Sequence, residues 1–496
     1  MDPAAAGISS IKEVLIDRNV PLIDEVRELI QGSGGPSLAP ILDSISKRTS
    51  SFPAWIGRRE REAAAQRAVA AAISWYRAEV EAPAAAIVRE RKAAAGPSPV
   101  RKVVVTTAGD ADAYRAALDG IEPDLSRIAA ATPGVLALRV SPPAAATHIA
   151  LHGGGGAVIA SADHSILALY YGHYRPCQPS TGFYLVYDAW ANSLAAVPPL
   201  PPTSISFFSH RCIGSAGVAV LRLRHGPPAS DYVLAELLLR YSDRNCRATL
   251  CLWCSSGPDA GRWIQREVIL PLPSSSGSEF CADTVLAVGG SSLCWVDLRI
   301  GVLVCDDIPL LAGRSADDDL AADTTAAVSF RFIPLPDGCA SIGAVDPLSR
   351  HGRGRPEERR SMCSPCSSAD DGGGVIKFVS MEGHAAGCTI NTWTLHLWDD
   401  PDLEWKRGAA PLCVGKLWDD PTYRDLKLPA MIMPSRPLLS MLQDDAVYLY
   451  MTANLVISVG MRRGKVISAL RSHPQSHGRS YQLPCLNWIL SSPCTS

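Results

Sequence analysis

The sequence has neither the long apolar runs typical of a membrane protein nor the excess of one charge typical of a nucleic-acid-binding protein. None of its 496 residues lie in an uninterrupted apolar stretch of about 18, so we expect no transmembrane helix. Its 47 basic side chains nearly balance 49 acidic ones, which leaves a net charge of −2. Because no global field attracts nucleic acid or anionic lipid, we expect neither nucleic acid nor membrane as a partner.

The amino terminus also lacks the pattern of a secretory leader. The stretch MDPAAAGISSIKEVLIDRN carries charge inside each apolar window and has no basic segment before an apolar one. No Asn-x-Ser/Thr glycosylation site occurs anywhere. These absences predict a soluble intracellular protein of the cytoplasm or nucleus.

Several catalytic motifs are absent as well. The sequence contains no Walker A, H-E-x-x-H, G-x-G-x-x-G, EF-hand or G-x-S-x-G pattern. We therefore assign no catalytic, cofactor-binding or metal-binding residue and expect no cofactor. One enzymatic alternative stays open, a hydrolase acting on a carbohydrate or ester from a central pocket, with Asp163, His164 and His173 as candidate groups.

The 15 cysteines are irregularly spaced. Many lie in apolar runs, where a reduced cysteine acts as a small buried hydrophobic residue; these are Cys212, Cys251, Cys281, Cys294, Cys305 and Cys413. Cys251 and Cys254 are three apart in a predicted strand and should face opposite sides of a sheet, which makes a poor zinc chelate. Cys363 and Cys366 form a second such pair, so a zinc-dependent protein remains an alternative.

Two regions of different secondary structure are expected. Residues 1–96 are predicted to be a helical N-terminal region, because Ile73, Tyr76, Val80 and Ile87 recur near helical spacing; Pro83 should kink that helix. Residues 97–496 are predicted to be β-rich, with short apolar or alternating runs separated by turn residues. A propeller-like arrangement of antiparallel strands is favoured over a sandwich or barrel. The predicted strands are His148–His152, Ala157–Ala160, Ile166–Tyr171, Phe183–Asp188, Gly217–Arg224, Tyr232–Leu239, Thr249–Cys254, Trp263–Leu270, Thr284–Val288, Leu293–Leu298, Val302–Cys305, Val375–Val379, Thr389–Leu397, Ala446–Met451 and Val456–Ser458.

Residues 350–374 interrupt this pattern. The segment RHGRGRPEERRSMCSPCSSADDGGG has almost no apolar content and ends in glycines, which predicts a flexible surface insertion. Its arginines, Arg350 to Arg360, would then form a solvated patch.

The stretch SSLCWVDLRIGVLVCDD (291–307) predicts a hairpin. Leu293–Leu298 and Val302–Cys305 should be antiparallel strands joined by a three-residue loop with Gly301 in the left-handed position. In that register Trp295 pairs with Cys305, and Cys294 faces away from Cys305, so no disulfide joins the two cysteines.

The pentapeptide LWDDP occurs at 397–401 and again at 417–421. Adjacent aspartates suit calcium binding or acid–base catalysis, but Asp-Asp-Pro after an apolar strand is also a strand end followed by a turn. We favour turns.

Three segments resemble one known family. Cys294-Trp-Val-Asp-Leu298, Gly301-Val-Leu-Val-Cys-Asp306 and Arg331-Phe-Ile-Pro-Leu-Pro336 resemble signature elements of the plant family called domain of unknown function 1618 (DUF 1618). Thr389–Leu395 with Trp405, Leu417-Trp418, Leu428-Pro429 and Asp444–Tyr450 resemble its later segments, so the resemblance covers roughly 140–460.

The family that the chain resembles has no established enzymatic activity, so the resemblance supplies no catalytic residue for this chain. The family is expanded in grasses, and its strand pattern is similar to that of F-box-associated β-propeller domains. We therefore expect a non-catalytic β-propeller-like module that binds a protein partner.

Overall fold

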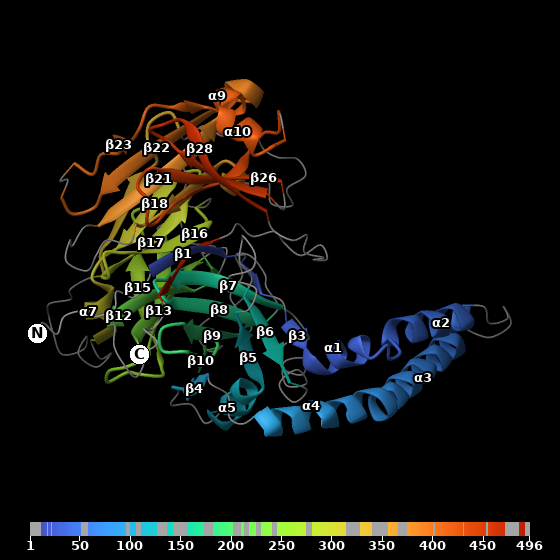
Figure 1. The fold of residues 1–496 in the computed structure, drawn as a ribbon. Helices are drawn as coiled ribbons and strands as arrows, with labels where there is room; N and C mark the ends of the chain where they lie inside the picture. Colours follow the sequence, from blue (N-terminus) through green and yellow to red (C-terminus); the bar gives the residue numbers. More distant parts are fainter. Residues whose placement is uncertain are drawn as a thin grey trace, which may run out of the picture.

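Short strands rich in apolar residues are the commonest elements of the molecule, which is mainly β with several antiparallel sheets (Figure 1). The computed structural model describes residues 11–16, 18–20, 22–50, 58–95, 100–105, 111–125, 136–141, 156–172, 182–201, 210–212, 218–224, 230–240, 246–273, 280–313, 328–339, 356–365, 374–399, 402–429, 431–452, 455–471 and 486–491. The predicted strand His148–His152 lies outside these residues.

Five larger sheets follow one another along the chain. The first contains β2 (Asn19–Val20), β7 (Gly156–Asp163), β8 (Ile166–Gly172), β9 (Phe183–Asp188), β10 (Ser193–Val197) and β4 (Arg101–Val104). The second contains β11 (His210–Cys212), β12 (Ala219–Arg224), β13 (Asp231–Arg240), β14 (Arg247–Cys254) and β15 (Trp263–Ile269). The third contains β16 (Thr284–Val288), β17 (Ser292–Asp297), β18 (Gly301–Cys305) and β19 (Phe330–Pro334).

The fourth and fifth sheets complete this series. The fourth contains β20 (Arg360–Cys363), β21 (Val375–Glu382), β22 (Thr389–His396), β23 (Lys406–Arg407) and β24 (Leu412–Cys413). The fifth contains β25 (Ser435–Leu439), β26 (Ala446–Thr452), β27 (Leu455–Gly460) and β28 (Lys465–Arg471). Each of the five sheets includes a run of four consecutive antiparallel strands.

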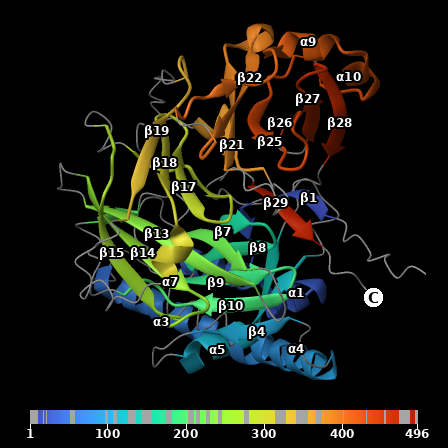
Figure 2. The same cartoon turned by 90° about the vertical axis from the view of Figure 1, so that its left-hand side faces the viewer.

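Consecutive sheets pack face to face, as Figure 2 shows from the side. One apolar cluster joins the first sheet to the second, and others join the second to the third, the third to the fourth and the fourth to the fifth. A strand between two such clusters is covered on both faces, so its residues are apolar in continuous runs. In β17, Trp295 faces the second sheet while Val296 faces the fourth, and all six residues are buried.

The N-terminal region is only partly helical. Its opening residues form β1 (Ile11–Ile16), β2 and β3 (Leu22–Asp24), so the expectation of a helix from Ile11 is wrong there. β1 pairs with β29 (Leu486–Ser491), far away in the sequence, and β3 pairs with β6 (Ala137–Val140), which in turn pairs with β5 (Ile121–Asp124). Pairing with remote strands overrides local helical propensity, because each strand gains a ladder of backbone hydrogen bonds.

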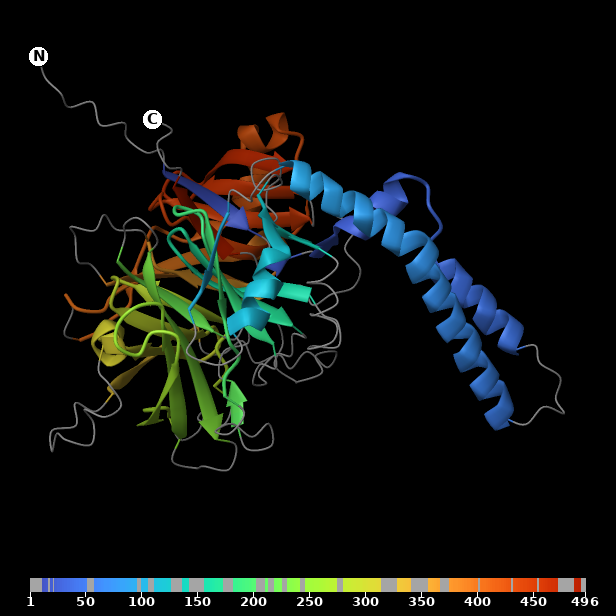
Figure 3. The ribbon, with the colours of Figure 1, turned by 90° about the horizontal axis from the view of Figure 1, so that it is seen from below.

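The helices after Asp24 form an arm that projects from the sheets (Figure 3). It consists of α1 (Glu25–Gly32), α2 (Leu38–Ser50), α3 (Arg58–Tyr76), η1 (Arg77–Glu81) and α4 (Ala82–Ala95). Val26 and Ile30 of α1 pack on Ala84 and Val88 of α4 at the base of the arm. No helix of the described residues is long and apolar enough to cross a membrane.

Pro83 perturbs the long helix of the arm without ending it. The turn before it, η1, is a π-helix, in which the Ala82 N–H donates to the carbonyl of Arg77, five residues earlier. A wider turn accommodates a proline ring, which would otherwise collide with the carbonyl four residues before it.

Shorter helices lie at the ends of strands: α5 (Ala111–Asp119), α7 (Ile308–Gly313), η2 (Pro356–Glu358), η3 (Ala385–Gly387), α9 (Val414–Asp419) and α10 (Pro421–Asp425). Ala117 and Leu118 of α5 cover the outer face of the first sheet. That face is therefore part of a core as well.

Candidate functional site

Asp163 and His164, candidates for hydrolysis, lie at the end of β7: Asp163 is the last residue of the strand, and His164 begins the turn to β8. His164 Nδ1 is 2.7 Å from Asp163 Oδ1, and the other carboxylate oxygen accepts the N–H of Arg222 in β12 at 2.7 Å. Asp163 thus joins the first sheet to the second. His173, the third candidate, lies outside the described residues, so the hydrolase alternative stays a prediction.

The cysteines are dispersed rather than gathered. Cys251 and Cys254 belong to clusters on opposite faces of the second sheet, as predicted. Cys281, Cys294 and Cys305 are buried, whereas Cys413 is half-exposed, which corrects its predicted burial. Side-chain contacts of Cys212 lie outside the described residues, as does Cys366. Within the described part of the chain, no three His, Cys, Asp or Glu side chains are placed to share a metal ion.

Burial keeps several thiols protonated. It raises the pKa of Cys254 to about 11 and that of Cys305 to about 12, and nearby carboxylates, Asp259 and Asp306 respectively, add to the effect. The pKa of Cys294 is raised for the same main reason. A thiol is nucleophilic as the thiolate, so these three residues are suited to packing and not to redox chemistry.

The hairpin of the third sheet has the predicted faces but a different register. Leu293 lies opposite Cys305 and Asp297 opposite Gly301, two residues from the predicted pairing. A shift of two keeps every side chain on its face. Cys294 and Cys305 therefore face opposite ways, and both are free thiols, as expected.

The requirement for glycine at position 301 also has a different cause from the predicted one. The loop consists of residues 298–300, so Gly301 is the first residue of β18. A Cβ there would overlap with the carbonyl oxygen of Ile333 and approach the Phe332 ring of β19. Close approach of a neighbouring strand, and not a left-handed turn, requires glycine here.

The segments that resemble DUF 1618 are joined by polar contacts. Arg331 in β19 forms an ion pair with Asp306 at 2.8 Å, and Asp306 also accepts the Ser292 hydroxyl. Arg331 Nη1 reaches the carbonyl of Leu397, 3.5 Å away in the turn directly after β22 of the fourth sheet. The Trp405 indole N–H donates to the Pro334 carbonyl at 2.8 Å. These motif residues hold the third sheet to the fourth.

Part of the segment 350–374 is structured, which corrects its assignment as a flexible insertion. Arg360–Cys363 is β20, paired with β21, and Arg360 is only 1% exposed. Its guanidinium donates to the carbonyls of Leu298 at 2.9 Å and of Cys339. Burial lowers the pKa of this guanidinium. Arg360 is therefore a buried side chain that joins two other parts of the chain, and it is not part of a solvated patch. The sequence analysis missed its burial because the neighbouring residues are polar.

Glu236 is a second buried charge that the sequence analysis missed. It is fully buried in β13 and accepts a hydrogen bond from the Tyr184 hydroxyl of the first sheet. A signal was present in the sequence, because Glu236 interrupts the apolar run VLAELLL of this strand.

The two LWDDP segments differ in structure. At 397–399 the chain turns after β22, as predicted. At 417–421 the segment instead joins α9 to α10, so the expectation of a strand end is wrong there. Asp420 caps α10 by accepting the Thr422 N–H at 3.2 Å, and it also accepts the Val466 N–H at 2.9 Å.

These features define a class: a multi-sheet antiparallel β protein whose motif residues support the junctions between sheets. Residues 295–448 match the model of a family described as "Protein of unknown function (DUF1618)". The match confirms the resemblance to the DUF1618 family over that range. A search of curated proteins found no match.

Proposed function

We propose that the chain is a non-catalytic, propeller-like module that binds another protein. The five sheets have the strand order of propeller blades, and successive sheets pack on each other. The first strands of the four-stranded runs in three successive sheets, β7, β12 and β16, contact one another, as inner strands of a propeller do. This arrangement supports the proposal.

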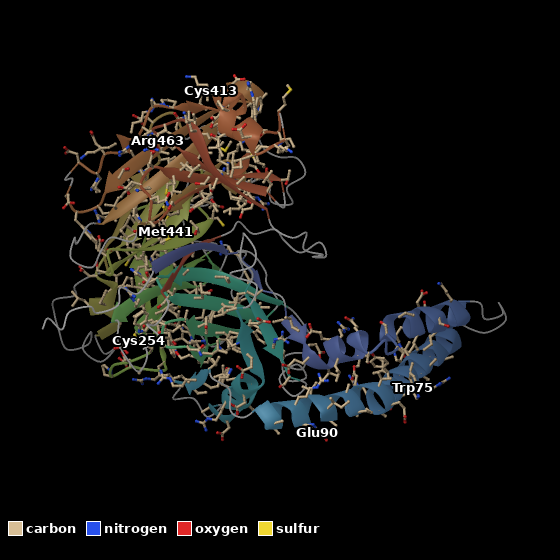
Figure 4. The ribbon with its side chains drawn as sticks, viewed as in Figure 1. Trp75, Glu90, Cys254, Cys413, Met441 and Arg463 are labelled. Carbon is tan, nitrogen blue, oxygen red and sulfur yellow. The ribbon has the colours of Figure 1, made fainter. Side chains whose placement is uncertain are left out.

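The helical arm is the observation that carries the interaction role. Among the α2 and α3 side chains that the structure describes, only Tyr76 is buried. Trp75 is 49% exposed, and Figure 4 places it on the arm, remote from Cys254 in the sheets. Helices in proteins gain most of their stability by packing an apolar face. A partner that covers α2 and α3 would therefore stabilise these two helices.

The polar groups of the sheets favour a structural role over catalysis. Asp163, Asp297 and Asp420 each accept backbone N–H groups, and Arg360 donates to carbonyls. Groups committed in this way are poorly placed to exchange protons with a substrate.

Proximity labelling with the full chain tests the proposal. We expect a reproducible protein partner whose enrichment falls at least several-fold in Trp75→Glu. Ile467→Glu, at a 57% exposed position on β28, is the matched control and should retain the partner. Recovery of no reproducible partner, or equal loss in both variants, would count against an interaction through the arm.

A further inference from the structure

The Trp398 ring packs directly against two glycines, one beside the third sheet and one beside the fourth. A Cβ at Gly289, in the turn after β16, or at Gly374, before β21, would overlap with the indole ring. Both positions therefore need glycine for the ring to lie there. Even so, Trp398 remains 40% exposed.

The second LWDDP segment is an internal comparison, because its residues have structural roles. There Trp418 packs on the core between the fourth and fifth sheets, and Asp420 caps a helix. In the first segment the indole is exposed, and the Asp399 side chain is 75% exposed, 3.8 Å from His396 Nδ1. The exposure of Trp398 and Asp399 is therefore not explained by the core packing and helix capping that account for the second segment.

Exposed acidic residues are frequent in the chain segments that adjoin Trp398. Asp399, Asp402 and Glu404 are exposed in the following loop. Asp307 is exposed beside the glycine turn, because the next residue, Ile308, donates its N–H to Ser291 in that turn. Among the described residues, the nearby basic groups include His396, 3.8 Å from Asp399, Arg331, whose charge is paired with Asp306, and Lys406 at the far end of the loop.

An exposed indole with an exposed carboxylate on the next residue of the chain is suited to a planar cation. A guanidinium stacks on an aromatic ring and pairs with a carboxylate at the same time, whereas an ammonium is a compact, strongly hydrated charge. We propose that Trp398 and Asp399 form a docking site for an arginine side chain of a protein or peptide. This site goes beyond the proposed function, since it lies on the sheets and does not depend on the arm.

Fluorine NMR of the full chain labelled with 5-fluorotryptophan tests the proposal with a defined probe. The Trp398→Phe variant identifies the Trp398 signal by its disappearance, and unfolding midpoints confirm that each variant is folded. We expect a capped tetra-arginine peptide to shift that signal saturably while the Trp75 signal stays in place. A tetra-lysine peptide of equal charge should bind several-fold more weakly, and tetra-glutamate should cause no shift.

Matched substitutions in the two LWDDP segments complete the test. Asp399→Asn should weaken tetra-arginine binding by about two- to five-fold, the range expected for an exposed ion pair. Asp419→Asn, at the equivalent and equally exposed position of the second segment, should leave binding unchanged. An unmoved Trp398 signal, equal response to arginine and lysine, or identical affinity in Asp399→Asn would overturn the proposal. A shift caused only by a neutral oligosaccharide would overturn it in favour of a sugar site. Partner binding through the arm is measured in a separate experiment. Either proposal can therefore be refuted while the other one stands.

Discussion

At the scale of single residues, several buried polar side chains satisfy backbone groups within the sheets and between them. Asp297 is fully buried and accepts the N–H groups of Cys281 and Arg299, each at 2.9 Å. Arg18, also fully buried, donates to the carbonyls of Ile159 and Ala160 beside a bulge in β7. Such groups would each cost about 1–3 kcal/mol if they lost their partner.

The buried thiols predict that the protein loses stability in alkali. The pKa values of Cys254 and Cys305 are about 11 and about 12 in the folded chain, against about 8.5 in an unfolded one. Between these values the folded state keeps protons that the unfolded state has lost. The thiols' contribution to stability should therefore be fully present below about pH 8.5. Above that pH the free energy of unfolding should fall by about 1.4 kcal/mol per pH unit for each thiol. Urea titrations from pH 8 to 11 measure this slope, and an equal slope in Cys305→Ala would contradict the assignment.

Gly301→Ala should destabilise the third sheet. The added methyl group would meet the Ile333 carbonyl, which belongs to the backbone of β19 and cannot move aside alone. We expect a loss of about 1–3 kcal/mol in the free energy of unfolding, measured with guanidinium chloride. Gly387→Ala is the control, because nothing lies near its Cβ position; similar losses in both variants would refute the explanation.

At the scale of elements, apolar periodicity predicted most of the central strands. Phe183–Asp188 matches β9 at both ends, and Thr284–Val288 matches β16. The sequence analysis missed strands with polar or mixed residues, such as β20 and β28, and also the apolar, fully buried strand β10. Their strand conformation depends on a neighbouring ladder, which a local pattern does not contain.

The α9–α10 corner depends on one aspartate. Asp420→Ala removes both the cap of α10 and the acceptor for the Val466 N–H of β28. We expect a loss of about 1–3 kcal/mol in the free energy of unfolding, because Asp420 is buried. Asp419→Ala, 81% exposed on its side chain, should change stability by less than about 0.5 kcal/mol. Equal effects at the two positions would show that the cap is unimportant.

At the scale of the whole molecule, the two ends of the described chain pair with each other. Ile11 lies opposite Ser491 and Ile16 opposite Leu486 in an antiparallel ladder. The amino-terminal strand thus depends on residues more than 450 positions away. A helical assignment for Ile11 onward failed for this reason.

Removal of residues 486–496 should expose this dependence. Without β29, the amide groups of Ile11–Ile16 lose their hydrogen-bond partners, so hydrogen–deuterium exchange there should accelerate by at least ten-fold. Exchange in β27, which pairs with β26 and β28, is the internal control and should stay slow. Unchanged exchange in β1 would show that its pairing contributes little protection.

By itself the sequence determined the β-rich class, the faces of the 291–307 hairpin and its free cysteines, because alternation of side chains is a local property of a strand. It also carried motifs of the DUF1618 family, whose model matches residues 295–448. Tertiary structure alone decided the hairpin register, the burial of Arg360 and the different conformations of two identical LWDDP segments. Each of these depends on which remote backbone groups lie nearby, and the free energy of satisfying them exceeds the local preference of the residues involved.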